Sequence, residues 1–476
     1  MKNEITENDS TNKPFVYQQK TITRAVFRAY DIRGIIGEEL DEDSFYTLGL
    51  AISCLLRTLQ RSQIFLARDG RLTSERLAKA LKAGLLDSGV SVFDLGEVAT
   101  PVMYYATHTQ GIDSGLMVTG SHNPAAYNGI KMVLAGKTLV QTDIDQLYQL
   151  VQTQARVHGA GEAKDFNILK SYAERIVGDI HVKRPLKVVV DCGNGIGGLT
   201  IPEVIRATGC EVIPLYCEVD GRFPNHHPDP TVEANLSDLK KAVVENNADI
   251  GLAFDGDADR LGLVTNEAEV IWPDRLLMFY AKELLKTQKG STIVYDVKCS
   301  SELARIIEEA GGVPKMCPTG HSIVKAVMKE EQAVLAGEMS GHLFFKERWY
   351  GFDDALYSAC RLLEMLSATN SSVSDQFKTI PNSINTPEIK IPISDTEKFS
   401  FMESFCASAE FPEASLIRID GLRVEFKDGW GLLRASNTTP CLVARFEAKD
   451  ESCLERIQAL FKSQIQRFNH GLQCSF

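Results

Sequence analysis

The sequence predicts an α/β protein made of three similar units and a smaller α+β domain at the C-terminal end. Short apolar runs end in polar, glycine-rich turns and are followed by stretches with helical periodicity, which is the pattern of strand–loop–helix units. From about residue 380 the chain becomes rich in Pro and Ser and then alternates like antiparallel strands. At 476 residues, 44% of them apolar, the chain is long enough for roughly three or four domains.

The apolar runs that predict strands come in three pairs, and each run places a polar loop at the carboxyl end of its strand. Open α/β sheets bind ligands at this end. The pairs are IFLARDGR (64–71) with GLMVTGSHN (115–123), KVVVDCGNG (187–195) with IGLAFDGDADR (250–260), and TIVYDVKCS (292–300) with AVLAGEMSGH (333–342).

Helices are predicted between these runs. Ser74 is expected to cap a helix that ends at Gly89, and residues 166–180 and 271–287 have helical patterns as well. Near the end of the chain, residues 423–448 have the pattern of antiparallel strands around a polar loop. The predicted domains are residues 1–166, 167–270, 271–381 and 382–476.

Charge and cysteine content narrow the class of protein. The 63 acidic and 51 basic side chains give a net charge of −12, which argues against nucleic acid as the main partner. The eleven cysteines are odd in number and include no CxxC pair, so they indicate neither a disulfide framework nor a zinc site. The first twenty residues lack the apolar stretch of a signal peptide, and no segment approaches the roughly 18 apolar residues of a membrane span. We therefore expect a cytoplasmic protein with reduced thiols and no membrane association.

The loop DGDADR at 255–260 gives the strongest local signal. Its three aspartates follow an apolar run on a tight turn, and oxygen-only ligands suit Mg²⁺ or Ca²⁺ better than zinc. An EF-hand does not fit, because Arg260 stands at the sixth loop position, Asn266 stands at the twelfth, and LGLVT resumes as a strand. A solvated acidic turn is the alternative, but three like charges so close repel one another unless a cation offsets them. We favour a metal site.

The loop TGSHNP at 119–124 is the second signal. A serine on a glycine-containing loop between a strand and a helix can act as a nucleophile or carry a phosphate, although Ser121 could equally cap a helix. The GxSxG pattern of α/β-hydrolases does not match, since Thr119 and Asn123 stand at its glycine positions. His122 is adjacent to Ser121 in the sequence, so we expect it to point elsewhere rather than serve as the base for this serine.

Two further loops carry polar groups suited to a sugar phosphate. GEMSGH at 337–342 offers Glu338, Ser340 and His342 to sugar hydroxyls. RASNTTP at 434–440 places one guanidinium beside Ser, Asn and Thr donors, a set that can bind a phosphate, although it could also be a polar hairpin tip.

Two other patterns point to different classes of protein. Residues 193–198, GNGIGG, satisfy the dinucleotide-binding pattern GxGxxG, and Glu218 lies at about the offset of a ribose-binding carboxylate. A nicotinamide-dependent oxidoreductase is therefore the alternative function, although glycines after a strand often only form a tight turn. The pair His226–His227, with Asp229 nearby, suggests a zinc site. No further ligand has suitable spacing, so we expect a polar loop.

Taken together and in this order, the loops TGSHNP, DGDADR, GEMSGH and RASNTTP resemble those of the α-D-phosphohexomutase family, and within it the bacterial phosphomannomutase/phosphoglucomutases. The similarity covers nearly the whole chain after the first twenty residues. It extends to FRAYDIRG (27–34), NGIK (128–131), DVKCS (296–300), PTGHSIVK (318–325) and GEMSGHLFFKERWYGFDDA (337–355). Four loops in the right order are more specific than any single loop and outweigh the dinucleotide pattern, so no NAD is expected.

The resemblance implies three α/β domains with mixed sheets and a C-terminal α+β domain around a central cleft. It also implies an isomerase that moves phosphate between O6 and O1 of mannose and glucose through a phosphoserine and a hexose 1,6-bisphosphate, which also serves as activator. Ser121 would be the phosphoserine, and Arg33, Lys131 and Arg260 would assist the transfer. One Mg²⁺ per chain would be held by Ser121 together with Asp255, Asp257 and Asp259.

The resemblance further assigns a set of residues to the binding of the sugar hydroxyls and of the phosphate that is not transferred. They are Tyr30, Lys298, His321, Glu338, Met339, Ser340, Gly341, His342, Arg434, Ala435, Ser436, Asn437 and Thr438. A catalytically silent sugar-phosphate-binding protein is disfavoured, because the serine and all three aspartates are present.

One residue departs from the family's pattern. The acidic loop of the family usually reads DGDGDR, whereas Ala258 stands here in place of the middle glycine. If this position requires a positive φ, alanine costs about 1 kcal/mol and would loosen the metal site.

Overall fold

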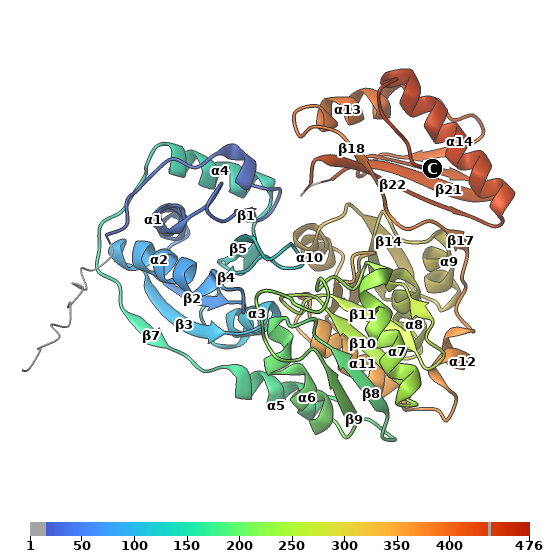
Figure 1. Ribbon diagram of the computed structural model, residues 1–476, viewed down its shortest axis with the longest axis horizontal. Helices are drawn as coiled ribbons and strands as arrows, with labels where there is room; N and C mark the ends of the chain where they lie inside the picture. Colours follow the sequence, from blue (N-terminus) through green and yellow to red (C-terminus); the bar gives the residue numbers. More distant parts are fainter. Residues whose placement is uncertain (1–15, 437–438) are drawn as a thin grey trace, which may run out of the picture.

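The computed structural model describes residues 16–436 and 439–476, and the strands of this part form four sheets. We number the domains I to IV by these sheets. Figure 1 shows domain I (blue to teal) at one end, domains II and III (green through olive to orange) packed together, and domain IV (orange-red to red) beside domain III. Three mixed sheets and one antiparallel sheet confirm the predicted fold class.

Domain I has a seven-stranded sheet in the order β1-β5-β4-β2-β3-β7, with β6 paired to β5. Its elements are η1 (Arg24–Val26), β1 (Ile32–Ile35), α1 (Glu42–Thr58), β2 (Gln63–Arg68), α2 (Ser74–Asp87), β3 (Ser91–Glu97), α3 (Thr100–Thr109), β4 (Gly115–Val118), β5 (Tyr127–Leu134), β6 (Lys137–Thr138), α4 (Gln141–Gln152) and β7 (Ala163–Asp165).

Domain II has five strands in the order β12-β11-β10-β8-β9. Its elements are α5 (Leu169–Asp179), β8 (Lys187–Asp191), η2 (Ile196–Leu199), α6 (Ile201–Ala207), β9 (Glu211–Leu215), η3 (Glu233–Leu236), α7 (Ser237–Glu245), β10 (Ile250–Phe254), β11 (Leu261–Thr265) and β12 (Val270–Ile271).

Domain III has four strands in the order β14-β13-β15-β16. Its elements are α8 (Pro273–Leu284), β13 (Thr292–Asp296), α9 (Ser301–Glu309), β14 (Val313–Cys317), α10 (His321–Glu330), β15 (Leu335–Gly337), β16 (Leu343–Phe345), α11 (Ala355–Leu366) and α12 (Val373–Phe377).

Domain IV has an antiparallel sheet in the order β17-β22-β21-β20-β19, with β18 also paired to β22. Its elements are β17 (Ile384–Asn385), β18 (Ile389–Pro392), α13 (Lys398–Ser408), β19 (Ser415–Ile417), β20 (Leu422–Phe426), β21 (Gly429–Ala435), β22 (Cys441–Ala448) and α14 (Glu451–Phe468). The predicted alternation over 423–448 is confirmed by β20, β21 and β22.

The first three domains share one strand plan. Three parallel strands are followed by an antiparallel one, in the orders β3-β2-β4-β5, β9-β8-β10-β11 and β14-β13-β15-β16. In each domain, a loop that the sequence singles out joins the last parallel strand to the antiparallel one. The prediction of a helix after TGSHNP is therefore wrong, because the chain turns directly into β5 and Ser121 caps no helix.

The central strands follow from their composition. Every residue of β10 (IGLAF) is buried, and in β8 only the first residue is partly exposed. Parallel strands covered on both faces are continuously apolar, which is why these runs are recognisable in the sequence.

Helix α2 corrects one capping prediction. Ser74 is the first helical residue rather than the cap, and its hydroxyl donates to Asp69 Oδ1 at 2.5 Å. The Ser74 hydroxyl therefore binds the Asp69 carboxylate instead of capping the N-terminus of α2 as the sequence predicts. The helix stops at Asp87, and Gly89 follows with φ +80°, close to the predicted end. Helices α5 and α8 lie within the predicted helical ranges 166–180 and 271–287.

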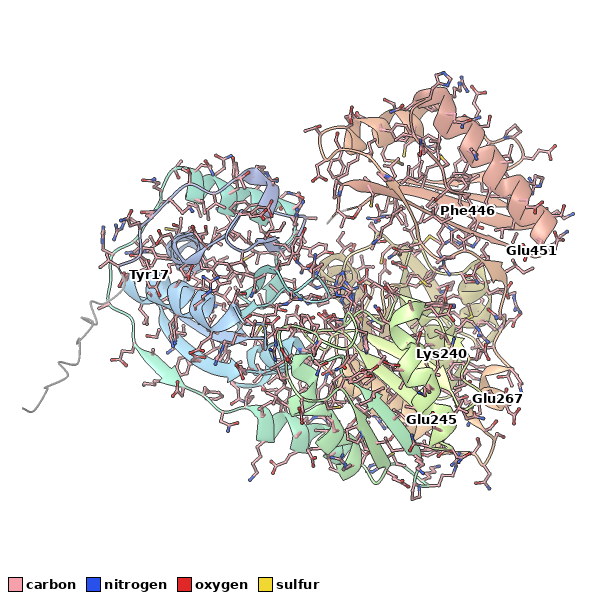
Figure 2. All side chains as sticks on the ribbon, in the orientation of Figure 1. Tyr17, Lys240, Glu245, Glu267, Phe446 and Glu451 are labelled. Carbon is pink, nitrogen blue, oxygen red and sulfur yellow. The ribbon has the colours of Figure 1, made fainter. Side chains whose placement is uncertain are left out.

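The apolar cores explain how the domains are joined. One continuous core contains residues of domains I, II and III, among them Tyr104, Phe254 and Phe345. Domain IV has its own core, in which Phe446 on β22 lies 5.3 Å, between ring centroids, from Phe461 on α14 (Figure 2). Polar contacts also join domain IV to domain III. Within residues 16–436 and 439–476, no helix has the length and apolar character needed to span a bilayer.

Candidate active site

Ser121 lies in the turn between β4 and β5 and is 2% exposed, with φ +50°. Its Oγ is 3.3 Å from Asp255 Oδ2 and 3.2 Å from His122 Nδ1. The expectation that His122 points away from this serine is therefore wrong, because the left-handed backbone at Ser121 turns the neighbouring ring toward the hydroxyl. Burial and nearby cations lower the pKa of His122 well below its ordinary value, so the ring is neutral.

Arg71 holds the serine loop in shape. Its Nη1 donates to the carbonyl oxygens of Pro124 at 2.7 Å and Tyr127 at 3.0 Å, and its Nη2 donates to those of Ser121 at 2.7 Å and Asn123 at 2.6 Å. The sequence analysis does not find this residue. The available signal is the polar sequence RDGR (68–71), which begins with the last residue of β2 and lies at the carboxyl end of a strand parallel to β4.

The carboxylate of Asp69 completes this support. It forms an ion pair with Arg71 and accepts hydrogen bonds from the Thr119 hydroxyl at 2.7 Å and the Gly120 amide at 3.3 Å. A Cβ at Gly120 would lie 2.5 Å from Arg71 Cζ, so only glycine fits against the guanidinium. The turn is thus held by a buried ion pair and its hydrogen bonds to the loop backbone.

The acidic loop brings three carboxylates together. Asp255, Asp257 and Asp259 are fully buried, and each offers an oxygen within 4.8 Å of the others. Burial and the two neighbouring carboxylates raise the pKa of Asp255 well above its ordinary value. Like charges in this arrangement require cations close by.

The donor set fits a hard divalent cation. All three side chains offer carboxylate oxygens. Asp257 Oδ1 is buried and has no hydrogen-bond partner in the part of the chain that the structure describes, as expected of an atom that serves as a ligand. Lys131 Nζ lies 2.6 Å from Asp257 Oδ2 and also contacts Asp259 Oδ2. Although burial lowers the pKa of Lys131, these carboxylates raise it above the ordinary value overall, so the amine is cationic.

Ala258 has φ +62° and is 1% exposed. The position therefore requires the left-handed conformation that the sequence comparison with DGDGDR suggested, and alanine bears a strain of about 1 kcal/mol there. The surrounding turn, closed by the Ala258 amide on the Asp255 carbonyl at 3.0 Å, holds this conformation.

His342 links the acidic loop to the sugar loop. Its Nε2 is 3.2 Å from Asp259 Oδ1, and its Nδ1 is 3.1 Å from Glu338 Oε2 and 3.0 Å from Ser340 Oγ. Burial lowers the pKa of His342, but the two carboxylates outweigh this effect and raise it to about 9, so the ring is cationic at neutral pH. In the same loop, Met339 packs into the core and Gly341 has φ +93°.

Tyr30 of domain I contacts the start of α10. Tyr30 packs edge-on against His321 with 4.7 Å between ring centroids. Among the described residues, neither ring nitrogen of His321 has a hydrogen-bond partner, although the ring is buried and its Nδ1 lies 3.6 Å from Asp353 Oδ2. Arg33 donates to Asp31 at 2.6 Å and to Asn123 Oδ1 at 2.5 Å, which places it beside the serine loop.

Domain IV contributes a second basic group. Arg434 is buried, its Nε donates to Asp420 Oδ2 at 2.9 Å, and its Nη2 has no hydrogen-bond partner within residues 16–436 and 439–476. Lys298 lies in domain III and donates to Glu388 of domain IV at 2.6 Å. Ala435 ends β21, and the Ser436 hydroxyl lies 2.7 Å from Thr439 Oγ1. Asn437 and Thr438, also predicted to bind phosphate, lie outside the described residues.

The four predicted loops are joined by one continuous path of contacts. Hydrogen bonds, one strand bridge and one peptide link make up this path. In order they connect Ser121, Asp255, Arg260, His342, Glu338, Gly320, Thr319, Asp420 and Arg434. The structure thus brings together groups from all four domains that the sequence places up to 313 residues apart.

The glycines of 193–198 have a packing role. The Ile196 amide donates to Gly256 O at 3.1 Å, and a Cβ at Gly195 would lie 2.8 Å from the same oxygen. These glycines therefore let the loop after β8 approach the acidic loop. His226 contacts Asp191 through Nε2 at 2.9 Å, which agrees with the polar loop expected there.

Comparison with known protein families identifies the family of the chain. Four family descriptions match in succession: "Phosphoglucomutase/phosphomannomutase, alpha/beta/alpha domain I" at residues 24–158, domain II at 170–268, domain III at 272–383, and the C-terminal domain at 388–463. The fold and the site thus define a four-domain α/β isomerase. The chain belongs to the phosphoglucomutase/phosphomannomutase family.

Individual relatives agree with this assignment. The chain is 50% identical to a phosphomannomutase/phosphoglucomutase of Pseudomonas putida, over 95% of this chain and 98% of that protein. It is 47% identical to a phosphoglucomutase of Neisseria gonorrhoeae, over 94% and 98%. A crystal structure of a phosphoglucomutase/phosphomannomutase family protein from Burkholderia thailandensis superimposes with a TM-score of 0.91 at 45% identity, covering 96% of this chain and all of that one.

Proposed function

We propose that the protein interconverts the 6-phosphates and 1-phosphates of mannose and glucose through a phosphoserine at Ser121 and a hexose 1,6-bisphosphate intermediate. The observation that carries this proposal is the position of the Ser121 hydroxyl, 3.3 Å from Asp255 in the acidic loop of another domain. A buried serine between a carboxylate cluster and basic side chains is suited to hold a phosphoryl group away from water.

We propose that Asp255, Asp257, Asp259 and a phosphoryl oxygen on Ser121 hold one Mg²⁺. The ion supplies positive charge beside the phosphoryl oxygens when it is bound. The relatives' structures include an N-acetylphosphoglucosamine mutase of Aspergillus fumigatus in complex with GlcNAc-6P and magnesium, which supports this choice of metal. The unpartnered Asp257 Oδ1 supports it independently.

The chain's own cations neutralise the phosphoryl group in this proposal. Arg33 reaches Asn123 in the serine loop, and Arg260 lies 4.0 Å from Asp255, so both guanidinium groups stabilise charge during transfer. Lys131, which Asp257 and Asp259 keep protonated, donates a proton to the substrate oxygen when the phosphoryl group leaves it. The neutral His122 ring contacts the Ser121 oxygen and orients the hydroxyl for the step in which the serine is phosphorylated again.

Domains III and IV bind the rest of the substrate in this proposal. Glu338 and the GEMSGH loop receive the sugar hydroxyls, and the free nitrogens of His321 offer further partners. Arg434 binds the phosphate that is not transferred through Nη2, which has no other partner among the described residues. The remaining predicted residues of this set, Tyr30 and Lys298 among them, line the same region.

An assay with glucose 1-phosphate and mannose 1-phosphate tests the proposal. We expect both to be converted to 6-phosphates, turnover to require Mg²⁺ and a hexose 1,6-bisphosphate, and intact mass to show one phosphate on Ser121. Ser121→Ala should be inactive, whereas Ser53→Ala, a buried change in α1, should keep activity. Binding of sugar phosphates without turnover would indicate a silent binding protein, and NADH-dependent turnover would indicate an oxidoreductase.

We also infer that the protein is cytoplasmic, because its eleven cysteines are free thiols.

A further inference from the structure

Two cysteines outside the candidate active site are in direct contact. Cys192 directly follows β8, Cys217 lies just beyond β9, and their Sγ atoms are 3.6 Å apart. In the described part of the chain, no other pair of thiols forms such a contact. The contact arises because β8 and β9 run parallel with Asp191 opposite Leu215. The segments that follow the two strands therefore leave the sheet side by side.

The two thiols differ in access to solvent. Cys192 is fully buried, whereas Cys217 is partly exposed and lines a surface hollow of about 500 Å³ together with Asn194, Arg206 and Glu218. A small solute can therefore reach Cys217 but not Cys192.

The two thiols also differ in acidity. Contact with Cys192 lowers the pKa of Cys217, whereas contact with Cys217 and burial raise the pKa of Cys192 well above its ordinary value. The accessible sulfur is thus the better nucleophile, and the buried one is positioned to react second.

A short hydrogen-bonded segment connects this pair of cysteines to the acidic loop. Cys192 is followed by the turn at Gly193 and Gly195, and the next amide, that of Ile196, donates to Gly256 O at 3.1 Å. Gly256 stands between two of the aspartates proposed to hold the metal. The Asn194 amide also donates to the Tyr216 carbonyl at 2.7 Å, so both cysteines belong to one bonded loop pair. A displacement of Cys192 therefore reaches the acidic loop through a single turn.

We propose that Cys192 and Cys217 are a redox modification site that forms a reversible disulfide with a low-molecular-weight disulfide as oxidant. The Cys217 thiolate attacks one sulfur of the oxidant, forms a mixed disulfide and releases one thiolate. Cys192 then loses its proton and attacks Cys217 Sγ, which forms the internal disulfide and releases the second thiol. The protein loses two electrons and two hydrogens, and the oxidant is reduced to two thiols.

The disulfide slows turnover by shifting the acidic loop. A disulfide requires the sulfurs to approach to about 2 Å, so Cys192 and the turn after it must move toward Cys217. We expect roughly a tenfold or larger loss of kcat, since a 1 Å misplacement in an active site can cost on the order of a hundredfold. The formation of the disulfide is independent of the proposed function, but this effect on turnover rests on it.

Oxidised glutathione added to the full-length protein tests the modification. Peptide mapping without reductant should show Cys192 linked to Cys217, and a thiol reductant should reverse the link. Hydrogen exchange should become faster at residues 193–197 and 255–259 in the oxidised protein. Absence of this link, or linkage among other cysteines instead, would overturn the proposal, and neither measurement requires catalytic activity.

Matched variants test the effect on turnover. Cys217→Ser should retain full kcat in the presence of oxidised glutathione. The control Cys406→Ser removes a different partly exposed thiol, which lies in domain IV, and should be inhibited like the wild type. Inhibition that persists in Cys217→Ser, or a linked protein with unchanged kcat, would refute the regulatory effect. A reduced protein without mutase activity would instead refute the proposed function, and the mapping and exchange results would still stand.

Discussion

Lys131 on β5 of domain I lies with its Nζ 2.6 Å from Asp257 Oδ2 in the acidic loop of domain II. Both groups are buried, so the contact places a positive charge from one domain inside a cluster of negative charges from the next. Lys131 pairs with Asp259 as well, so its removal would leave two buried carboxylates without this cation, and breaking a buried ion pair in this way typically costs about 3–5 kcal/mol. The serine loop and the acidic loop are therefore held together by the same residues that we propose to carry out the chemistry.

Asp257→Asn should weaken Mg²⁺ binding and abolish most turnover. The substitution keeps the size of the side chain but removes the charge of an oxygen that has no other partner among the described residues. Changes in residues that only support a metal ligand cost roughly 10–100-fold in affinity, so loss of a ligand should cost at least that much. Titration calorimetry with Mg²⁺ and activity against Mg²⁺ concentration measure the effect. Asp375→Asn, an exposed change on α12, is the control, and wild-type affinity in Asp257→Asn would contradict a metal site.

Arg71→Lys should lower kcat at least tenfold with little change in KM. Lysine keeps the charge but cannot donate to four carbonyl oxygens at once, so the serine loop loses its shape while the sugar-binding loops remain. Steady-state kinetics and the phosphate content of Ser121 measure the effect. Arg76→Ala removes an exposed arginine of α2 and should match the wild type. A change confined to KM would mean that Arg71 contacts substrate instead of positioning the loop.

The pH dependence of stability should contain a contribution from His342. Its pKa is about 9 in the folded protein, above the ordinary value of about 6.5. The stabilisation is therefore complete below about pH 6.5 and is lost as the pH rises through 9, with an upper magnitude of about 3 kcal/mol. Urea unfolding with a chelator present, at several pH values, measures this loss. It should be absent in His342→Gln and present in His158→Gln, a change at an exposed histidine.

The central strands and the order of the four loops could be predicted from the sequence for a physical reason. Buried parallel strands such as KVVVD and IGLAF are continuously apolar, and the polar loops interrupt these runs abruptly. The conformation of Ala258 could also be anticipated, because the family's glycine at that position indicates a positive φ, and the structure has φ +62°.

Contacts that depend on the path of the backbone could not be predicted. Arg71 donates to carbonyl oxygens, which every residue has, so the side chains of residues 121–127 do not predict that an arginine binds this loop. The contact between His122 and Ser121 requires the left-handed backbone at Ser121, and the sequence suggests a helix at that point instead. The Cys192–Cys217 contact depends on the register of β8 with β9, which the sequence does not specify.

Arg434→Ala should raise KM, lower kcat and make turnover depend more strongly on added hexose 1,6-bisphosphate. The intermediate must turn end over end between the two transfers, so the RASNTTP loop has to bind either phosphate and release each in turn. Arg434 supplies a guanidinium with one nitrogen already on Asp420 and with Nη2 unpartnered in the described part of the chain. Its loss should remove about 1.5–3 kcal/mol of charged hydrogen bonding, roughly 10–150-fold. Because this phosphate is bound in ground and transition states alike, much of the loss should appear in KM. Kinetics with and without bisphosphate test it beside Arg418→Ala, an exposed arginine of the same domain. An unchanged KM and bisphosphate requirement would show that Arg434 does not bind the distal phosphate.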